Sequence, residues 1–447
     1  MGANFVNIDR ESPMLLPPDL KDWVEGNDLV HFILEVVEGC DTSCAATNHR
    51  GTGSAQYPPA MMLSLLVYCY ATGCFSSRQI ERATYDSVAV RYLCGNTHPD
   101  HDTIASFRRR NKALLEHCFF QVLALAREIG LLKMGTLSVD GTKIKGSARQ
   151  GGQKTLAQID AELEALEKQT SELLKKAEQY EKEEQDQSGL NLPGELSCTE
   201  ARKKKLIKAR QCLEGRLQRL KENRKKSRER YQLPSSERKR PGKKPDPKVE
   251  KRRAEEEEAK QKISLSDPES HRLPHRKEGF IQGYNAQASV CVGTRIIAST
   301  QLGNSPNDSQ QLEPTLSYLD EKERQNIKEI LADKGYWDGL KLPQLEKNLE
   351  CIILCPPKQS KATLSKPYPK HHPRKKMDRF KRKMKRRLKT RQGQELYKKR
   401  SSTSEGPFNV IKNIMGFKEF RLRGLEGAQI EWNLVTLAYN CRKLAKI

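Results

Sequence analysis

The order of strand-like and helical segments after residue 136 constrains the fold more than any other feature of this chain. Residues 136–148 are a short β-type run, and two further strand patterns, at 280–292 and 294–303, meet at a turn. Helix and strand patterns then alternate to about residue 355. Three antiparallel strands followed by strand–helix–strand crossovers predict a mixed five-stranded sheet with helices on both faces.

Ribonuclease-H-like folds have this order of elements, so we expect an α/β core of that class over residues 134–447. Residues 1–133 are expected to form an all-α N-terminal domain, because apolar helical patterns alternate there with short turns. Two segments interrupt the expected core. One is a helical hairpin with a flexible, charged stretch at 150–265, and the other is a basic loop at 358–400 that holds 19 Lys and Arg.

The charge balance favours a polyanionic partner. Lys and Arg number 81 against 57 Asp and Glu, a formal net charge of +24, and nucleic acid is the first candidate for such a chain. A basic protein of another kind, such as a ribosome-associated factor, would also bind nucleic acid. No apolar run approaches the roughly 18 residues that a membrane span needs, so we expect no membrane contact.

The 12 cysteines are scattered, and the N-terminus does not resemble a signal peptide, so we expect a cytoplasmic, nucleoid-associated protein. Cys40 and Cys44 share a three-residue spacing with the pair Cys351 and Cys355. A zinc site usually needs a second pair of ligands, and none lies nearby in the sequence. We interpret these cysteines as packed thiols.

The interruption at 150–265 carries a heptad pattern typical of two helices packed along a seam. Apolar residues recur at alternating steps of three and four on both sides of a turn-like segment. The seam positions are Leu156, Ile159, Leu163, Leu166, Leu173, Ala177 and Tyr180, followed by Leu206, Leu213, Leu217 and Leu220. We interpret the segment as an antiparallel helical hairpin and hypothesise that it mediates dimerisation or contact with DNA ends.

In the N-terminal region, prolines open an apolar helix at 58–70, and a later helix contains Arg108, Arg109 and Arg110 in a row. Short helices joined by tight turns, with such a basic end, are typical of a helix-turn-helix-like DNA reader, in which these arginines would contact DNA. An ordinary helical bundle with one basic face fits the same residues.

Three acids in separate elements are candidates for metal-dependent chemistry on a phosphodiester. Asp140 lies in the first strand run, where a buried charge is costly unless it is paired or metal-bound. Asp333 ends a later strand, where ligands of open α/β sheets collect. Glu405 is expected to open the last helix, after a Ser/Thr run. Each acid alone is equally well explained as a turn or cap residue, but together, on this strand order, they favour metal binding.

Hard divalent cations suit this chemistry. Two such ions can activate an attacking oxygen and stabilise a leaving oxygen, and Mg²⁺ takes carboxylate, water and phosphate oxygens as ligands. Two other acids, Asp267 and Asp308, are better explained by turn and capping roles than by an auxiliary role at the site. Tyr336 and Trp337 are better explained by core packing than by stacking on a flipped base.

Four stretches carry patterns more specific than three scattered acids. They are residues 57–111, 139–148, 280–290 with 332–339, and 404–440. Their most distinctive parts are VDGTKIKGSA around Asp140, ADKGYWDG around Asp333 and the block that begins at Ser404. With these stretches the chain resembles the DDE transposases of bacterial insertion sequences that carry an InsH-like N-terminal domain. The resemblance covers nearly the whole chain apart from the inserted hairpin and the basic loop.

The resemblance implies a role for each acid. The first, second and third acids of the family match Asp140, Asp333 and Glu405, which would be the catalytic residues and would hold two ions of Mg²⁺ or Mn²⁺. The family often has Glu-Pro-Val-Phe-Gly where this chain has Glu-Gly-Pro-Phe-Asn from Glu405 on. This difference bears on where the helix of Glu405 begins.

A related Tyr-Arg-Glu-Lys signature is also present. Its members are Tyr397, Arg400, Glu405 and Lys412. Four residues separate Arg400 from Glu405, where related transposases often have three. The resemblance implies that Arg400 and Lys412 contact DNA phosphates near the cut, and the alternative is that both are solvated charges.

The implied function is DNA transposition. The enzyme would recognise terminal inverted repeats, hydrolyse DNA at the ends and transfer the 3′ ends to target DNA, with a homodimer joining two ends. Two alternatives are a metal-dependent DNA nuclease without strand transfer and a catalytically inactive relic that binds DNA. The N-terminal domain and the hairpin favour a transposase over a nuclease, because joining ends requires end recognition and synapsis. The presence of all three acids weighs against a relic.

Overall fold

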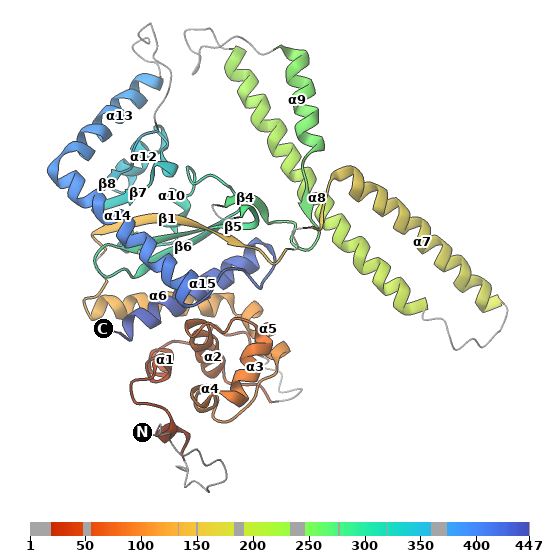
Figure 1. Ribbon diagram of the computed structural model, residues 1–447, viewed down its shortest axis with the longest axis horizontal. Coiled ribbons are helices and arrows are strands. Elements are labelled where there is room, and N and C mark those ends of the chain that lie inside the picture. Colours follow the sequence, from red (N-terminus) through yellow and green to blue (C-terminus); the bar gives the residue numbers. More distant parts are fainter. Residues whose placement is uncertain are drawn as a thin grey trace, which may run out of the picture. The chain divides into compact units, whose positions relative to one another are not determined.

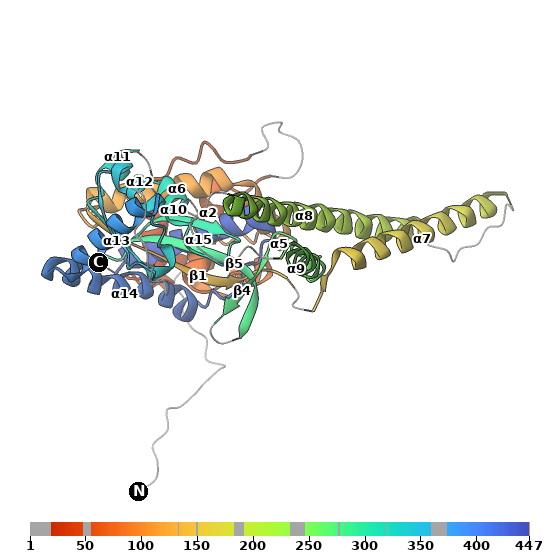
Figure 2. The same ribbon diagram turned by 90° about the horizontal axis from the view of Figure 1, so that it is seen from above.

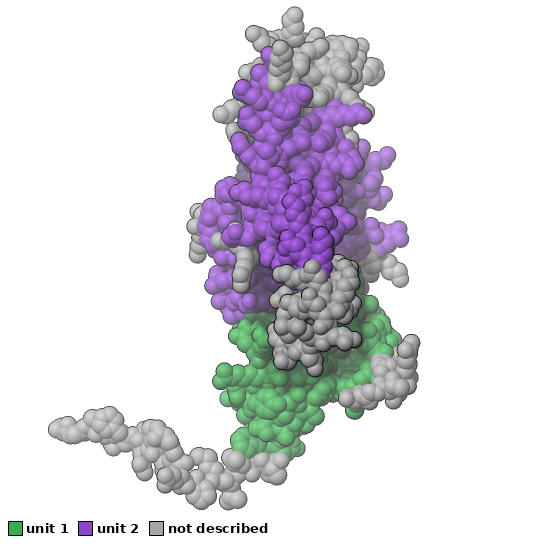
Figure 3. Space-filling view, turned by 90° about the vertical axis from the view of Figure 1, so that its right-hand side faces the viewer, with its two compact units in different colours: residues 1–122, 437–447 green, residues 123–436 purple. Residues whose placement is uncertain are grey.

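The computed structural model describes most of the chain in two compact units, which Figure 3 colours separately. The described residues are 19–47, 55–132, 134–148, 151–182, 192–232, 246–275, 278–319, 321–358 and 373–446. Unit 1 comprises residues 1–122 and 437–447, and unit 2 comprises residues 123–436. The boundary therefore lies at 122/123 rather than at the predicted 133/134, and the end of the chain belongs to unit 1.

Unit 1 is helical, in agreement with the sequence pattern. Its elements are the 3-10 helix η1 (Leu20–Trp23), α1 (Leu29–Glu38), α2 (Pro59–Ala71), α3 (Ser77–Asp86), α4 (Val88–Leu93), α5 (His101–Arg110) and the first part of α6 (Lys112–Glu128). Helix α2 opens at Pro59, because a proline lacks only an N–H that would have no partner at a first helical position. All ten residues from Met62 to Ala71 are buried, so α2 is the central helix of this unit.

Unit 2 is built on one mixed sheet (Figure 1). Its strands are β1 (Thr136–Lys145), β4 (His271–His275), β5 (Gly279–Cys291), β6 (Ile297–Gly303), β7 (Glu329–Ala332) and β8 (Ile352–Leu354). The long strand β5 pairs with β1 along one edge, and with β4 and then β6 along the other. The prediction of five strands missed β4, because its sequence HRLPH has little of the apolar alternation that identifies a strand.

The strand order β6–β5–β1–β7–β8 agrees with a ribonuclease-H-like core. β1, β5 and β6 are antiparallel neighbours, whereas β7 and β8 run parallel to β1. The helices around the sheet are α10 (Leu312–Ser317), α11 (Glu321–Gln325), the 3-10 helix η2 (Lys334–Tyr336), α12 (Lys341–Asn348), α13 (Pro373–Lys389), α14 (Arg391–Asn409), the π-helix η3 (Val410–Ile414) and α15 (Gly424–Leu444).

Helices pack on both faces of the sheet. Side chains alternate between the faces along each strand, and Thr300 shares its face with Asp140 through the paired strand β5. Thr300 donates a hydrogen bond to Asn433 of α15, so α15 covers that face. Ser299 lies on the opposite face and donates to the carbonyl of Thr315 in α10.

The insertion between β1 and β5 contains two long helices that pack along the predicted seam (Figure 2). Its helices are α7 (Leu156–Lys182), α8 (Leu192–Gln232) and α9 (Pro247–Ala259). The buried seam residues are Ile159, Leu163, Leu166, Leu206, Ala209 and Leu213. The ion pairs Asp160–Arg210 and Glu167–Lys203 show that α7 and α8 run antiparallel, because one number rises as the other falls.

The base of the insertion is held by a two-stranded ribbon, in which β2 (Gln153–Lys154) pairs with β3 (Ile263–Ser264). The stretch predicted to be flexible contains the helix α9, while residues 233–245 lie outside the described residues. The seam positions Ala177 and Tyr180 lie outside the described side chains.

The segment 358–400, predicted as a basic loop, is helical where it is described. Helices α13 and α14 occupy most of it, and residues 359–372 lie outside the described part. Lys and Arg are good helix formers, and Phe380 and Met384, one turn apart, bury an apolar strip. Glu405 accordingly lies inside α14, near its C-terminal end, and does not open the last helix. Among the described residues, no helix has the length and apolar character needed to cross a membrane.

Candidate active site

Two of the three predicted acids come from adjacent parallel strands. β1 and β7 pair as far as Val139 and Ala332, so the next residues, Asp140 and Asp333, are neighbours across the sheet. Paired strands lie about 4.8 Å apart. The backbone of Asp333 is still extended, with φ −72° and ψ 163°, before the chain turns into η2. The register therefore brings together two acids that are far apart in the sequence.

Helix α14 lies over Asp140 and supplies two side chains to its carboxylate. The Ser404 hydroxyl donates to Oδ2 of Asp140 at 3.1 Å, and the Arg400 guanidinium donates to the same oxygen at 3.4 Å. The amide of Gly141 donates to Oδ1 at 2.9 Å. Arg400 and Ser404 are one helical turn apart, so the same face of α14 presents both to β1.

Burial raises the pKa of the Asp140 carboxyl above its ordinary value. The Gly141 amide, the Arg400 guanidinium and the Ser404 hydroxyl act in the opposite direction, and the neighbouring Asp333 carboxylate adds to the rise. The net rise means that the protein's own donors do not fully compensate the negative charge of Asp140. A cation bound beside this carboxylate would supply that compensation.

Arg400 lies within electrostatic reach of all three predicted acids. Burial alone lowers the pKa of its guanidinium, but the surrounding acidic groups raise that pKa overall. Those groups are Asp140, Tyr397, Asp333 and Glu405. The Arg400 side chain is only 15% exposed, so the alternative of a solvated charge does not apply to it.

The donor chemistry of the site fits a hard divalent cation. The three acids all act electrostatically on the Arg400 guanidinium, and carboxylate oxygens are ligands that Mg²⁺ and Mn²⁺ take. The side chains are not gathered into a ready site, because Glu405 is exposed while Asp140 is bound to Arg400. Within the described residues, no group of three or more His, Cys, Asp or Glu side chains is arranged to hold a metal ion.

A buried polar network that sequence reasoning missed supports the turn after Asp333. Asn285 and Gln287, both fully buried on β5, donate to Oδ1 of Asp308 at 2.7 and 3.0 Å. Tyr336, in η2, donates its hydroxyl to Oε1 of Gln287. The network thereby ties the Asp333 turn to the middle of the sheet. Two polar residues at alternate positions of the apolar strand sequence GYNAQAS were the available signal.

The remaining acids and aromatics have packing roles. Asp267 accepts hydrogen bonds from the Tyr284 hydroxyl at 2.7 Å and the Gly424 amide at 3.1 Å. Tyr336 is 1% exposed, and Trp337 stacks on Phe380 with ring centroids 5.8 Å apart.

Lys412 is held by the backbone of β1. Its ammonium donates to the carbonyl oxygen of Lys143 at 2.9 Å, and burial lowers its pKa. Lys412 is therefore partly buried and hydrogen-bonded in this arrangement, and its contact with a phosphate stays a prediction.

The three arginines at the end of α5 differ in exposure. Arg108 is 4% exposed and donates to the Tyr70 hydroxyl at 2.6 Å and the Phe75 carbonyl at 3.0 Å. The structure gives Arg108 a packing role in place of the predicted DNA contact, because the helix turns it toward α2. Arg109 and Arg110 are exposed, and their contact with DNA stays a prediction.

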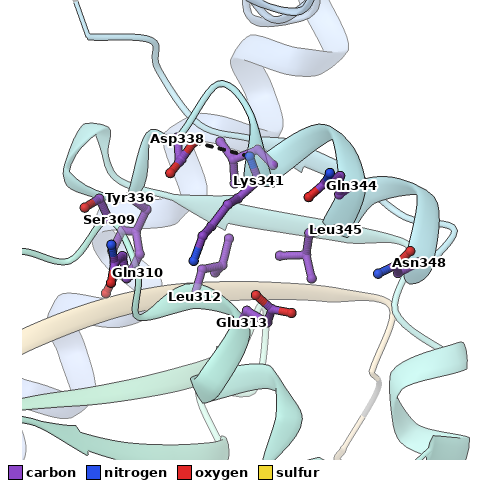
Figure 4. Close-up of a pocket in the computed structure, with 11 residues that line it drawn as sticks. Ser309, Gln310, Leu312, Glu313, Tyr336, Asp338, Lys341, Gln344, Leu345 and Asn348 are labelled. Atoms are coloured by element: carbon purple, nitrogen blue, oxygen red, sulfur yellow. Dashed lines mark hydrogen bonds between the residues drawn. The ribbon is translucent and has the colours of Figure 1, made fainter. Parts of the chain in front are cut away.

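A small pocket of about 120 Å³ lies beside the buried network (Figure 4). Residues on α10, η2 and α12 line it, and Tyr336 forms one wall. Asp338 accepts hydrogen bonds from the backbone amides of Leu340 and Lys341 at 2.9 and 3.2 Å, and these bonds fix the start of α12. Ligand sites usually measure about 300–1,000 Å³, so we assign no ligand to this pocket.

Models of known families match two parts of the chain. A model described as a transposase domain (DUF772) matches residues 18–110, and one described as a transposase DDE domain matches residues 258–441. The second match contains Asp333, Arg400 and Glu405, whereas Asp140 lies between the two matches. No curated protein matches the chain, and neither does any solved structure.

The match to the transposase DDE domain shows an enzyme that acts on DNA. More narrowly, the chain belongs to the DDE transposases of insertion sequences. Enzymes of this class generally use divalent metal ions.

Proposed function

We propose that this transposase binds the terminal inverted repeats of its element, hydrolyses DNA at the ends and transfers the 3′ ends to target DNA. The β1–β7 register supports this most directly, because it sets Asp140 beside Asp333 under the helix that carries Arg400. The catalytic residues are Asp140, Asp333 and Glu405, which hold two Mg²⁺ or Mn²⁺ ions.

Bound ions of this kind lower the barrier by activating the attacking oxygen and stabilising the leaving oxygen. The protein's own groups have separate tasks. The Gly141 amide and the Ser404 hydroxyl orient the Asp140 carboxylate. Arg400 pairs with Asp140 in the absence of DNA, and it exchanges that carboxylate for a phosphate near the cut, because a guanidinium binds either group in the same fork geometry. Lys412 contacts a neighbouring phosphate.

The other parts of the chain serve recognition and assembly. The exposed Arg109 and Arg110 of unit 1 contact DNA. Two copies form a homodimer that brings two element ends together on the nucleoid. The helical hairpin, inserted into a ribonuclease-H-like core, contributes to dimerisation or to DNA-end contact. Deleting residues 155–262 tests this role, since an unchanged oligomeric state together with unchanged end binding would exclude it.

Cleavage and joining by the purified protein test the proposed reaction. The substrate is DNA carrying the ends of the element, incubated with Mg²⁺, Mn²⁺ or EDTA. The variants Asp140→Ala, Asp333→Ala and Glu405→Ala are expected to bind DNA but neither cut nor join it. The matched control is Glu395→Ala, an exposed glutamate on the same helix α14, which is expected to retain activity.

Each alternative has a distinct result. Metal-dependent cutting without joining to a target plasmid would identify a nuclease. Binding of the ends without any cutting by the wild type would identify a DNA-binding relic. If one of the three variants still cut DNA, the assignment of that acid as catalytic would be wrong.

A further inference from the structure

Helix α13 carries a dense run of positive charge that leads into the site. Eight of the eleven residues from Arg379 to Lys389 are Lys or Arg, and none is acidic. Only Thr390, the N-cap of α14, separates α13 from the helix that carries Arg400. The charge is therefore connected to the catalytic face through a short, structured link.

One side of α13 is fixed against the protein. Phe380 and Met384 are buried, and the Phe380 ring stacks on Trp337. On the same side, Arg387 pairs with Glu346 of α12, and Lys383 lies 3.8 Å from it. Because the apolar side is occupied, the part of α13 from Arg379 to Lys389 has no free apolar face to insert into a membrane surface.

The opposite side of α13 presents five exposed cations between residues 379 and 389, of which Arg382 takes part in a further interaction within the protein. We define the outer face of α13 as Arg379, Lys385, Arg386 and Lys389. At 3.6 residues per turn these four fall within an arc of about 120° and span ~15 Å along the helix. None of the four forms an ion pair with a described acid, although Arg387 and Lys383 on the anchored side both do.

The inserted hairpin shows how this chain neutralises cations elsewhere. Arg202 pairs with Glu162 at the start of the hairpin, and Arg224 pairs with Glu257 of α9 at 2.6 Å. On the outer face of α13 such carboxylates are missing among the described residues, so like charges repel one another unless a polyanion lies against them.

We propose that the outer face of α13 binds the phosphate backbone of duplex DNA that leads to the three acids. This inference rests on the proposed function and extends it. One strand of a duplex carries a phosphate every 3.4 Å of axis, so a ~15 Å row faces about four phosphates. Contacts to phosphates carry no sequence information. The outer face therefore holds target or flanking DNA of any sequence, and the inverted repeats are read elsewhere.

The salt dependence of DNA binding tests this surface in the full-length protein. The probe is a synthetic duplex of arbitrary sequence. The test variant combines Arg379→Gln, Lys385→Gln, Arg386→Gln and Lys389→Gln. The control variant removes the same charge from exposed positions of unit 2 outside the inserted hairpin and combines Lys328→Gln, Lys347→Gln, Lys418→Gln and Arg421→Gln. Substitutions at exposed positions usually change stability little, so both variants are expected to unfold at the wild-type temperature.

The test variant is expected to reduce the steepness of the slope of log K against log salt concentration by about 3 to 4, since each phosphate contact contributes roughly 0.9 to that slope. The control variant is expected to change this slope by less than about 1. Equal changes in both variants would show that the effect comes from the net charge of the protein. An unchanged slope in the test variant would show that the outer face of α13 does not bind DNA. Either result would overturn the proposal.

Acetylation of the wild type gives a second measurement that needs no variant. The duplex is expected to protect Lys385 and Lys389 but not Lys328 and Lys347, which are exposed outside the hairpin. Equal labelling of Lys385 with and without DNA would contradict the proposal. If the wild type cuts and joins element ends while the outer face has no effect on DNA binding, this inference fails alone. If the outer face binds DNA but the wild type never cuts, the catalytic function fails and the surface remains.

Discussion

The hydroxyl of Tyr336 is the smallest group whose removal tests how the Asp333 turn is supported. In Tyr336→Phe the buried ring stays, so the packing of a side chain that is 1% exposed is retained. The hydrogen bond to Oε1 of Gln287 is lost, and a fully buried amide oxygen loses its donor. Leaving such a group without a partner costs about 1–3 kcal/mol.

Two measurements follow from this loss. The unfolding midpoint is expected to fall by roughly 2–12 °C, at about 2–4 °C for each kcal/mol in a large domain. DNA cleavage is expected to fall by about 10- to 100-fold, because a displacement of about 1 Å at a catalytic group has effects of that order. The turn that carries Asp333 is the element that shifts.

Tyr284→Phe is the matched control for Tyr336→Phe. Tyr284 is also fully buried in unit 2, and its hydroxyl donates to Asp267 at 2.7 Å. This variant is expected to lose at least as much stability, because the acceptor is a carboxylate, yet to cut DNA at nearly the wild-type rate below its midpoint. If both variants lost activity equally, the effect of Tyr336 would be global. If Tyr336→Phe were as stable and active as wild type, the network would not support the turn.

Three further outcomes are expected. Arg108→Ala should destabilise unit 1 by about 2–4 kcal/mol, because it removes hydrogen bonds to buried partners. Arg109→Ala should leave the unfolding midpoint unchanged and weaken DNA binding. If Arg108→Ala lost DNA binding but kept full stability, the packing role of Arg108 would be wrong. Asp140→Asn should stabilise the metal-free protein at neutral pH. The pKa of the Asp140 carboxyl is raised in the folded state, so this group favours folding below the unfolded pKa near 4, and that contribution is lost as the pH rises through the folded pKa. An equal gain in stability near pH 3 would refute this. Leu213→Ala should cost about 2–5 kcal/mol in the hairpin, read as faster proteolysis of α7 and α8 with no change in the sheet.

The strand order and the position of two acids were predictable because they depend on local patterns. Apolar runs marked β5, β6 and β7, and the acid that follows Ala332 stands at the end of its strand. The heptad seam predicted the packing of α7 on α8, since its period is set by the helix itself. These features need no knowledge of distant contacts.

The features that sequence reasoning missed depend on tertiary contacts. The run of Lys and Arg in α13 was predicted as a loop, because the sequence does not show that Phe380 packs against Trp337. Arg108 is indistinguishable from Arg109 in the sequence, and only the helix direction decides which one is buried. Glu405 was expected to open a helix after a Ser/Thr run, but α14 begins at Arg391 with Thr390 as its cap.

The short β2–β3 ribbon has a consequence for the order in which this chain folds. The central strands β1 and β5 are separated by 133 residues, from 146 to 278. Once Gln153–Lys154 pairs with Ile263–Ser264, the chain left to close is only 21 residues, at 146–152 and 265–278. Each halving of a loop lowers its closure entropy cost by about 0.6 kcal/mol, so the ribbon reduces that cost by about 1.6 kcal/mol. An insertion whose hairpin and ribbon form first therefore makes the central strand pair of the catalytic sheet easier to form.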